Sequence, residues 1–123
     1  MRLVILTLLL SVHGLSQDRR PAALSSPITN GRFEIVQSPM AAQYTFKLDR
    51  VRGQVWQHVE SKGESLWEPM LVVPPPDVST GTLPRFQIML SGIVARDSFL
   101  IDSQTGSVWI LTSGGWEGMK DIK

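Results

Sequence analysis

The sequence contains no cysteine among its 123 residues. This absence excludes a disulfide framework, a thiolate zinc site and a cysteine nucleophile. It also excludes the lipid-modified cysteine of a bacterial lipoprotein. Without disulfides, a small exported domain depends for its stability on its hydrophobic core or on partners.

Histidine and net charge are equally scarce. His13 lies in an N-terminal segment that we predict to be removed, which leaves His58 as the one histidine of the mature chain. The formal net charge is +1, so electrostatics give no case for nucleic acid or an anionic membrane as partner. The H-E-x-x-H, P-loop, G-x-G-x-x-G and G-x-S-x-G patterns are all absent. We therefore expect no catalytic residues, no metal and no cofactor, and a protein that is not an enzyme.

Residues 1–16 have the features of a secretory signal peptide. Met1-Arg2 supplies a short positive start, and the apolar run Leu3–Val12 is too short for a comfortable membrane span. Gly14 and Ser16 provide the small residues before a cut after Ser16. This segment predicts a secreted or periplasmic protein of a bacterium, and retention of the segment as an N-terminal anchor is the alternative.

The chain also repeats itself. Residues 32–56 align without a gap on residues 85–109 at a constant offset of 53, and ten of the 25 aligned pairs are identical. We interpret this as a duplication, and we divide the chain accordingly. The predicted parts are a signal peptide (1–16), an extended polar leader (17–31), a first β-repeat (32–73), a Pro-rich linker (74–84) and a second β-repeat (85–123).

Apolar residues within each repeat recur with a period of two, which is typical of strands. Phe86, Ile88 and Leu90 alternate with more polar neighbours, and no segment has the stripe and caps of a helix. The segment with Glu60 and Glu64 is expected to be a polar loop. The fold class is therefore all-β, with two homologous antiparallel meanders of three to four blade-like strands. They would pack as a small sandwich or partial barrel, or form part of an oligomeric propeller.

A β-hairpin is predicted at the same place in each repeat. Asp49 precedes Gly53, and Asp102 precedes Gly106, at the ends of two apolar alternations. An aspartate can accept backbone N–H bonds two residues on, and a glycine takes the left-handed conformation that follows a type I turn. We assign these four residues to turns, because this role fits the aspartates better than acid–base catalysis does.

Four tryptophans are the strongest candidates for surface chemistry. Trp56 and Trp109 are aligned, and Trp67 and Trp116 form a further match after a longer loop in the first repeat. Recurrence in both repeats favours packing in the core. The alternative is a ligand platform on which a sugar stacks against Trp56, Trp67, Trp109 or Trp116.

The repeats differ on what we take to be one face. This face carries Val36, Lys47 and Gln57 in the first repeat, and the aligned residues of the second repeat are apolar, namely Met89, Leu100 and Ile110. An apolar second face is typical of a sheet that is covered on both sides. We expect the Met89, Leu100 and Ile110 face to contact the first repeat, the linker, a second copy of the chain or another protein.

The string Phe99-x-Ile101-Asp102-x-x-Thr105-Gly106-x-Val108-Trp109 resembles a hairpin repeat of uncharacterised exported bacterial proteins, of the form F-x-[LI]-D-x-x-x-G-x-V-W. It is also similar to the blade signature of quinoprotein-type β-propellers. The resemblance implies blade-like antiparallel sheets, and it transfers no quinone-binding or catalytic residue. Two functions remain open. The first is an exported, non-catalytic β-repeat module for binding or assembly, and the second is a small lectin-like carbohydrate-binding protein that uses the repeat tryptophans.

Overall fold

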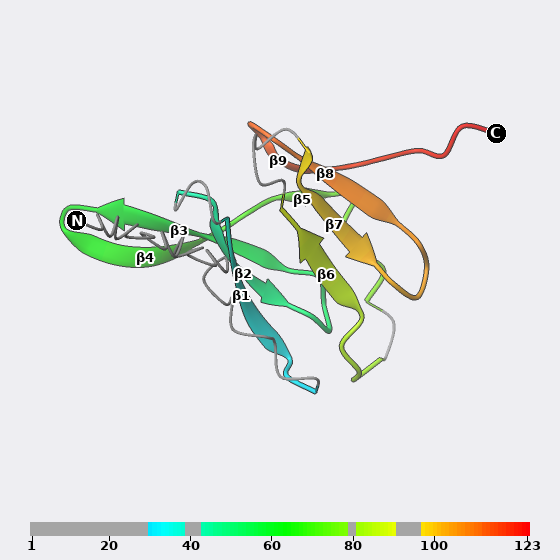
Figure 1. Ribbon diagram of the computed structural model, residues 1–123, viewed down its shortest axis with the longest axis horizontal. Helices are drawn as coiled ribbons and strands as arrows, with labels where there is room; N and C mark the ends of the chain where they lie inside the picture. The colour runs from blue at the N-terminus through cyan, green and yellow to red at the C-terminus, as the bar shows by residue number, and fades with distance from the viewer. Residues whose placement is uncertain (1–29, 39–42, 79–80, 91–96) are drawn as a thin grey trace, which may run out of the picture.

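The computed structural model describes residues 30–38, 43–78, 81–90 and 97–123. The predicted signal peptide and nearly all of the polar leader lie outside these residues. The described part of the chain folds into two sheets, which confirms the all-β prediction (Figure 1). The strands are β1 (Phe33–Gln37), β2 (Thr45–Asp49), β3 (Val55–Ser61), β4 (Glu64–Pro69), β5 (Val72–Val73), β6 (Phe86–Met89), β7 (Phe99–Asp102), β8 (Val108–Thr112) and β9 (Gly115–Gly118). Within the described ranges, no helix has the length and apolar content that a membrane crossing requires.

The first sheet is an antiparallel meander in the order β1-β2-β3-β4, as the sequence predicts. The second sheet has the order β5-β9-β8-β7-β6 and is mixed, because β5 runs parallel to β9. Val72 and Val73 were expected to belong to the first repeat, yet they form hydrogen bonds with the second sheet. The backbone carbonyl of Leu71 accepts a bond from Trp116 N at 2.9 Å. This close approach requires Gly115, where an added Cβ would lie 2.6 Å from the same carbonyl oxygen.

Both predicted hairpins are present, and their turns have the same geometry. The carboxylate of Asp49 accepts the N–H groups of Val51 and Arg52 at 3.0 and 3.1 Å, and Gly53 has φ +71°. In the second hairpin the Asp102 carboxylate accepts two backbone N–H groups, and Gly106 has φ +77°. Each glycine N–H also donates to the carbonyl of its aspartate at 2.8 Å. These turns place strands β2 and β3, and strands β7 and β8, side by side.

The segment expected to be a polar loop is instead a long hairpin, and that expectation is wrong. Strand β3 continues to Ser61, and β4 begins at Glu64 after a two-residue turn. Lys62 and Gly63 both have positive φ, at 51° and 77°, which is the type I′ conformation that matches strand twist. The hairpin extends beyond the rest of the first sheet, at the left of Figure 1. Its glutamates point into solvent, so the apolar alternation that marks a half-buried strand is missing.

The core lies between the two sheets. Phe46, Leu48 and Val55 contribute from the first sheet, and the second sheet supplies Phe86, Ile88, Leu100, Trp109 and Trp116. The rings of Phe46 and Trp116 meet edge to face across the interface, with centroids 5.7 Å apart. The main chain also joins the sheets, because Arg50 O accepts the N–H groups of Arg85 and Phe86. The molecule is therefore a two-layer sandwich in which each sheet has one inner and one outer face.

The strand register corrects the predicted grouping of Met89, Leu100 and Ile110. Residues directly opposite each other in an antiparallel pair share a face, and here Met89 pairs with Phe99, which pairs with Ile110. Leu100 instead lies opposite Ile88 and Trp109 and is fully buried in the core. Met89 and Ile110 therefore lie on the outer face, with Phe99 in place of Leu100.

The same correction applies to the first sheet. Val36 lies opposite Phe46, and Phe46 lies opposite Gln57, so these three residues line the inner face. Lys47 pairs with Ile35 and Trp56 on the outer face. The residues compared between the repeats therefore do not share one face. Lys47 lies on the opposite face from Val36 and Gln57, and Leu100 lies on the opposite face from Met89 and Ile110.

Candidate functional site

The outer face of the first sheet carries an aromatic cluster, which we define as Lys47, Trp56, His58 and Trp67. Strands β2, β3 and β4 place these side chains next to one another, because Lys47 pairs with Trp56 and His58 pairs with Trp67. The Lys47 ammonium lies 4.5 Å from the centroid of the Trp56 ring and 5.3 Å from that of Trp67. The His58 and Trp67 rings meet edge to face at 5.6 Å. A cation on two indole faces is a favourable arrangement that also leaves the rings partly open to a ligand.

The other two tryptophans are in the core. Trp109 is 3% exposed and Trp116 is 1% exposed. Trp109 Nε1 donates to Pro74 O at 2.8 Å, which holds the Pro-rich linker against the second sheet. The four tryptophans, for which core packing was favoured and a ligand platform was the alternative, are thus divided into an outer pair, Trp56 and Trp67, and an inner pair, Trp109 and Trp116. The sequence contains no signal for this division, because each outer tryptophan is aligned with an inner one. Trp56 is aligned with Trp109, and Trp67 with Trp116.

The outer face of the second sheet is largely apolar across β6, β7 and β8, where Gln87 is polar, and Glu117 of β9 lies beside Ile110 on the same face. Strand β6 contributes Met89, which is 59% exposed, and β7 contributes Phe99 and Ile101. Val108 and Ile110 lie opposite them on β8 and are partly exposed. No charged side chain of β6, β7 or β8 lies among these residues. We name them the β6–β8 outer face.

An arginine and an aspartate form the same ion pair in each half of the chain. Arg32 Nη2 lies 2.7 Å from Asp49 Oδ2, and Arg85 Nη2 lies 3.2 Å from Asp102 Oδ2. Burial of Asp49 raises the pKa of its carboxyl, but the hydrogen bond from Arg32 and two backbone N–H groups of the turn outweigh burial. The pKa of Asp49 therefore lies below its ordinary value. Because each carboxylate is occupied by an arginine and by turn N–H groups, these aspartates hold structure and are not placed to move protons.

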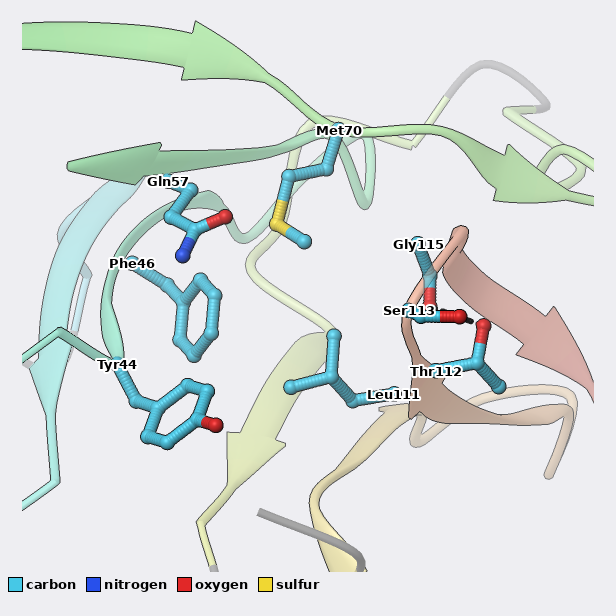
Figure 2. Close-up of a pocket in the computed structure, with 8 residues that line it drawn as sticks. All are labelled: Tyr44, Phe46, Gln57, Met70, Leu111, Thr112, Ser113 and Gly115. Atoms are coloured by element: carbon cyan, nitrogen blue, oxygen red, sulfur yellow. Dashed lines mark hydrogen bonds between the residues drawn. The ribbon is translucent and has the colours of Figure 1, made fainter. Parts of the chain in front are cut away.

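A cleft of about 450 Å³ opens between the sheets at one end of the sandwich. Figure 2 shows Tyr44, Phe46, Gln57 and Met70 on one side, facing Leu111 and the turn that follows it. The opposite wall is completed by Thr112, Ser113 and Gly115, where Thr112 Oγ1 lies 3.2 Å from Gly115 O. The lining is mostly apolar and contains no charged side chain. Sequence reasoning did not find this cleft, because its walls come from segments without a shared motif.

The described residues contain no group of three or more histidine, cysteine, aspartate or glutamate side chains that could hold a metal ion. Comparison with protein-family models, with curated proteins and with solved structures gives no match. Among the described residues, the aromatic cluster, the β6–β8 outer face and the cleft are three features that expose apolar or aromatic side chains.

Proposed function

We propose that this protein is an exported, non-catalytic module, built from two copies of one β-unit, that acts by binding or assembly. The observation that carries the proposal is the presence of apolar or aromatic side chains on both outer faces of the sandwich. Phe33 is 56% exposed and Ile35 is 62% exposed on the first sheet, and Met89 is similarly exposed on the second. Contiguous apolar surface of this kind usually marks an interaction site.

Matching side-chain contacts support the idea of two copies. The guanidinium of Arg32 lies 5.1 Å from the ring centroid of Phe33, and that of Arg85 lies 5.0 Å from that of Phe86. Each arginine also pairs with the aspartate at the aligned position of its own sheet. The two halves therefore share more than identical residues at aligned positions. The identical residues also make the same contacts in each half. The likeness to propeller blades is consistent with this unit.

The proposal is tested with the chain from residue 17 onward, by light scattering over a range of concentrations and by binding to a glycan array. A variant with Ile35→Glu and Met89→Glu has one charge on each outer face, and Leu83→Glu places the same charge on an exposed linker residue. We expect the wild type and the Leu83→Glu control to associate or to bind a ligand, and the double variant to do neither while melting normally. A wild-type chain that stays monomeric and binds nothing contradicts the proposal.

A second candidate function is carbohydrate binding by the aromatic cluster. The specific observation in its favour is the adjacency of Trp56 and Trp67, whose rings flank a single lysine on a partly open face. Sugars stack on indole rings, so binding should change the fluorescence of these two tryptophans. Trp67→Ala should then abolish binding. The matched Trp116→Ala variant is uninformative for binding because Trp116 is in the core, so Leu83→Glu serves as control. A glycan-array signal that survives Trp67→Ala contradicts this alternative.

A further inference from the structure

The two sheets bury opposite faces of the aligned unit. In β2 the buried apolar residues are Phe46 and Leu48, whereas their aligned counterparts in β7, Phe99 and Ile101, lie on the outer face. The reverse holds for the first strand of each half. Phe86 and Ile88 are buried in the core, and their aligned counterparts Phe33 and Ile35 are exposed.

This arrangement is a front-to-back contact. If the face with Phe46 is called the front of the unit, then the front of the first unit packs on the back of the second, which carries Ile88, Leu100 and Trp109. The contact is heterologous, because it joins two different surfaces. In a stack that has not closed into a ring, a heterologous contact leaves one unused surface of each kind, one at each end. Here the unused front is the β6–β8 outer face, and the unused back is the outer face of the first sheet.

We propose that the β6–β8 outer face of one chain packs on the outer face of the first sheet of a second copy, head to tail, and so reproduces the contact inside the chain. This inference rests on the proposed function and names its partner. If the rotation between successive units closes, the product is a ring. Closed propellers have typically 4–8 blades, so a ring would contain roughly two to four chains of two units each.

The residues that would meet correspond to pairs that already meet. Within the chain, Trp116 contacts the ring of Phe46 edge to face. The corresponding pair between chains is Trp67 and Phe99 of a second copy. Val36, which packs against the core from the front of the first unit, corresponds to Met89. Gln57 corresponds to Ile110. The unused front is therefore more apolar than the front that is already covered, which favours a covering partner over solvent.

Three positions on the receiving face are polar where the internal template is apolar. Lys47 stands where the second unit has Leu100, His58 where it has Leu111, and Gln37 where it has Leu90. The Lys47 ammonium already lies on the Trp56 and Trp67 rings, so its charge keeps a partner while its aliphatic stem contributes apolar surface. The receiving face therefore remains compatible with an apolar partner.

A complementation experiment tests the head-to-tail arrangement. Ile35→Glu blocks the receiving face alone, and Met89→Glu blocks the donating face alone, since each residue is more than half exposed and its replacement spares the core. We expect wild type to form a closed assembly by analytical ultracentrifugation. Each single variant should weaken self-association by about 100-fold or more, because the new charge is buried without a partner. An equimolar mixture of the two variants retains one intact pair of faces, so it should form a 1:1 dimer and nothing larger.

The outcomes separate this inference from the proposed function. A mixture that stays monomeric while wild type associates shows a contact other than head to tail, and overturns the inference. Association that is lost with Ile35→Glu but retained with Met89→Glu indicates a symmetric contact between two first sheets, and also overturns it. A wild type that is monomeric yet binds a glycan overturns the inference and leaves the proposed binding function standing. Normal melting of both variants and of Leu83→Glu shows that the effects are not due to misfolding.

Discussion

Two aligned glycines offer a direct measurement of the contact between the sheets. Gly53 and Gly106 end matching turns and have nearly equal φ values of 71° and 77°. They differ in what lies beside them. A Cβ added at Gly53 would lie 2.7 Å from Phe86 Cε1, whereas a Cβ at Gly106 would meet nothing within 4 Å. Substituting each by alanine therefore compares the same backbone strain with and without a core contact.

The expected magnitudes follow from this difference. An alanine in the left-handed conformation costs about 1–2 kcal/mol, and Gly106→Ala should lose only this amount of unfolding free energy. Gly53→Ala pays the same strain and must also displace the Phe86 ring, which is buried between the sheets. Overpacking of this kind adds about 1–3 kcal/mol. We thus expect about 2–5 kcal/mol for Gly53→Ala.

The assay is urea-induced unfolding followed by tryptophan fluorescence, carried out in the Ile35→Glu background so that association does not contribute. Phe86→Leu supplies the control, because a smaller side chain relieves the clash. When Phe86→Leu is also present, the loss of unfolding free energy caused by Gly53→Ala should fall to the loss caused by Gly106→Ala. Equal costs for the two alanine variants in the presence of Phe86 would refute the packing of the β2–β3 turn on the second sheet.

Two further predictions concern the core and the ion pairs. Trp109→Phe should lower the free energy of unfolding by about 1 kcal/mol more than Trp116→Phe in urea titrations, because Trp109 loses its bond to Pro74 whereas Trp116 Nε1 has no acceptor among the described residues. The pKa of Asp49 is lowered by folding, so the unfolded chain takes up this proton first as pH falls. The stability that Asp49 contributes is present at neutral pH and is lost below about pH 4, as pH falls through the folded pKa. Melting temperatures between pH 7 and pH 2 should therefore decline less steeply for Asp49→Asn than for wild type.

Either of these predictions has a clear contrary result. If Trp116→Phe is as costly as Trp109→Phe, then the hydrogen bond to the linker adds nothing to stability. If Asp49→Asn follows the wild-type pH profile, then the pair with Arg32 does not carry the acid sensitivity. Leu83→Glu controls both series, since it changes an exposed linker residue.

Local features of the fold could be predicted from the sequence, because local chemistry determines them. The hairpins at Asp49 and Asp102 need only a carboxylate that accepts turn N–H groups and a glycine that tolerates positive φ. The extension of β3 and β4 to the tight turn at Lys62 and Gly63 was missed because solvent surrounds this part of the hairpin, so its residues carry no alternating apolar pattern. Strand β5 was missed because two residues are too few to show any period, and their pairing with β9 depends on a distant glycine.

The division into faces could not be predicted, because it depends on strand register. A shift of one residue moves every side chain to the opposite face. In β7 the sequence Phe99-Leu100-Ile101 is apolar on both sides, so it does not reveal which side meets the core. The candidate site has the same difficulty. Trp56 and Trp109 are aligned and identical, yet one lies outside and the other inside, because the two units stack front to back.

Gly115 allows β5 to pair with β9, and the lack of an equivalent glycine in β4 limits which strands can pair with the edge of the first sheet. When the two halves are aligned on Trp67 and Trp116, Gly115 corresponds to Leu66 and Gly118 to Pro69. A side chain at the position of Gly115 would collide with the Leu71 carbonyl, and proline has no N–H to offer a neighbour. The free edge of β4 is therefore closed to an added strand of the β5 type. Edge-to-edge pairing that would add such a strand to β4 is therefore disfavoured.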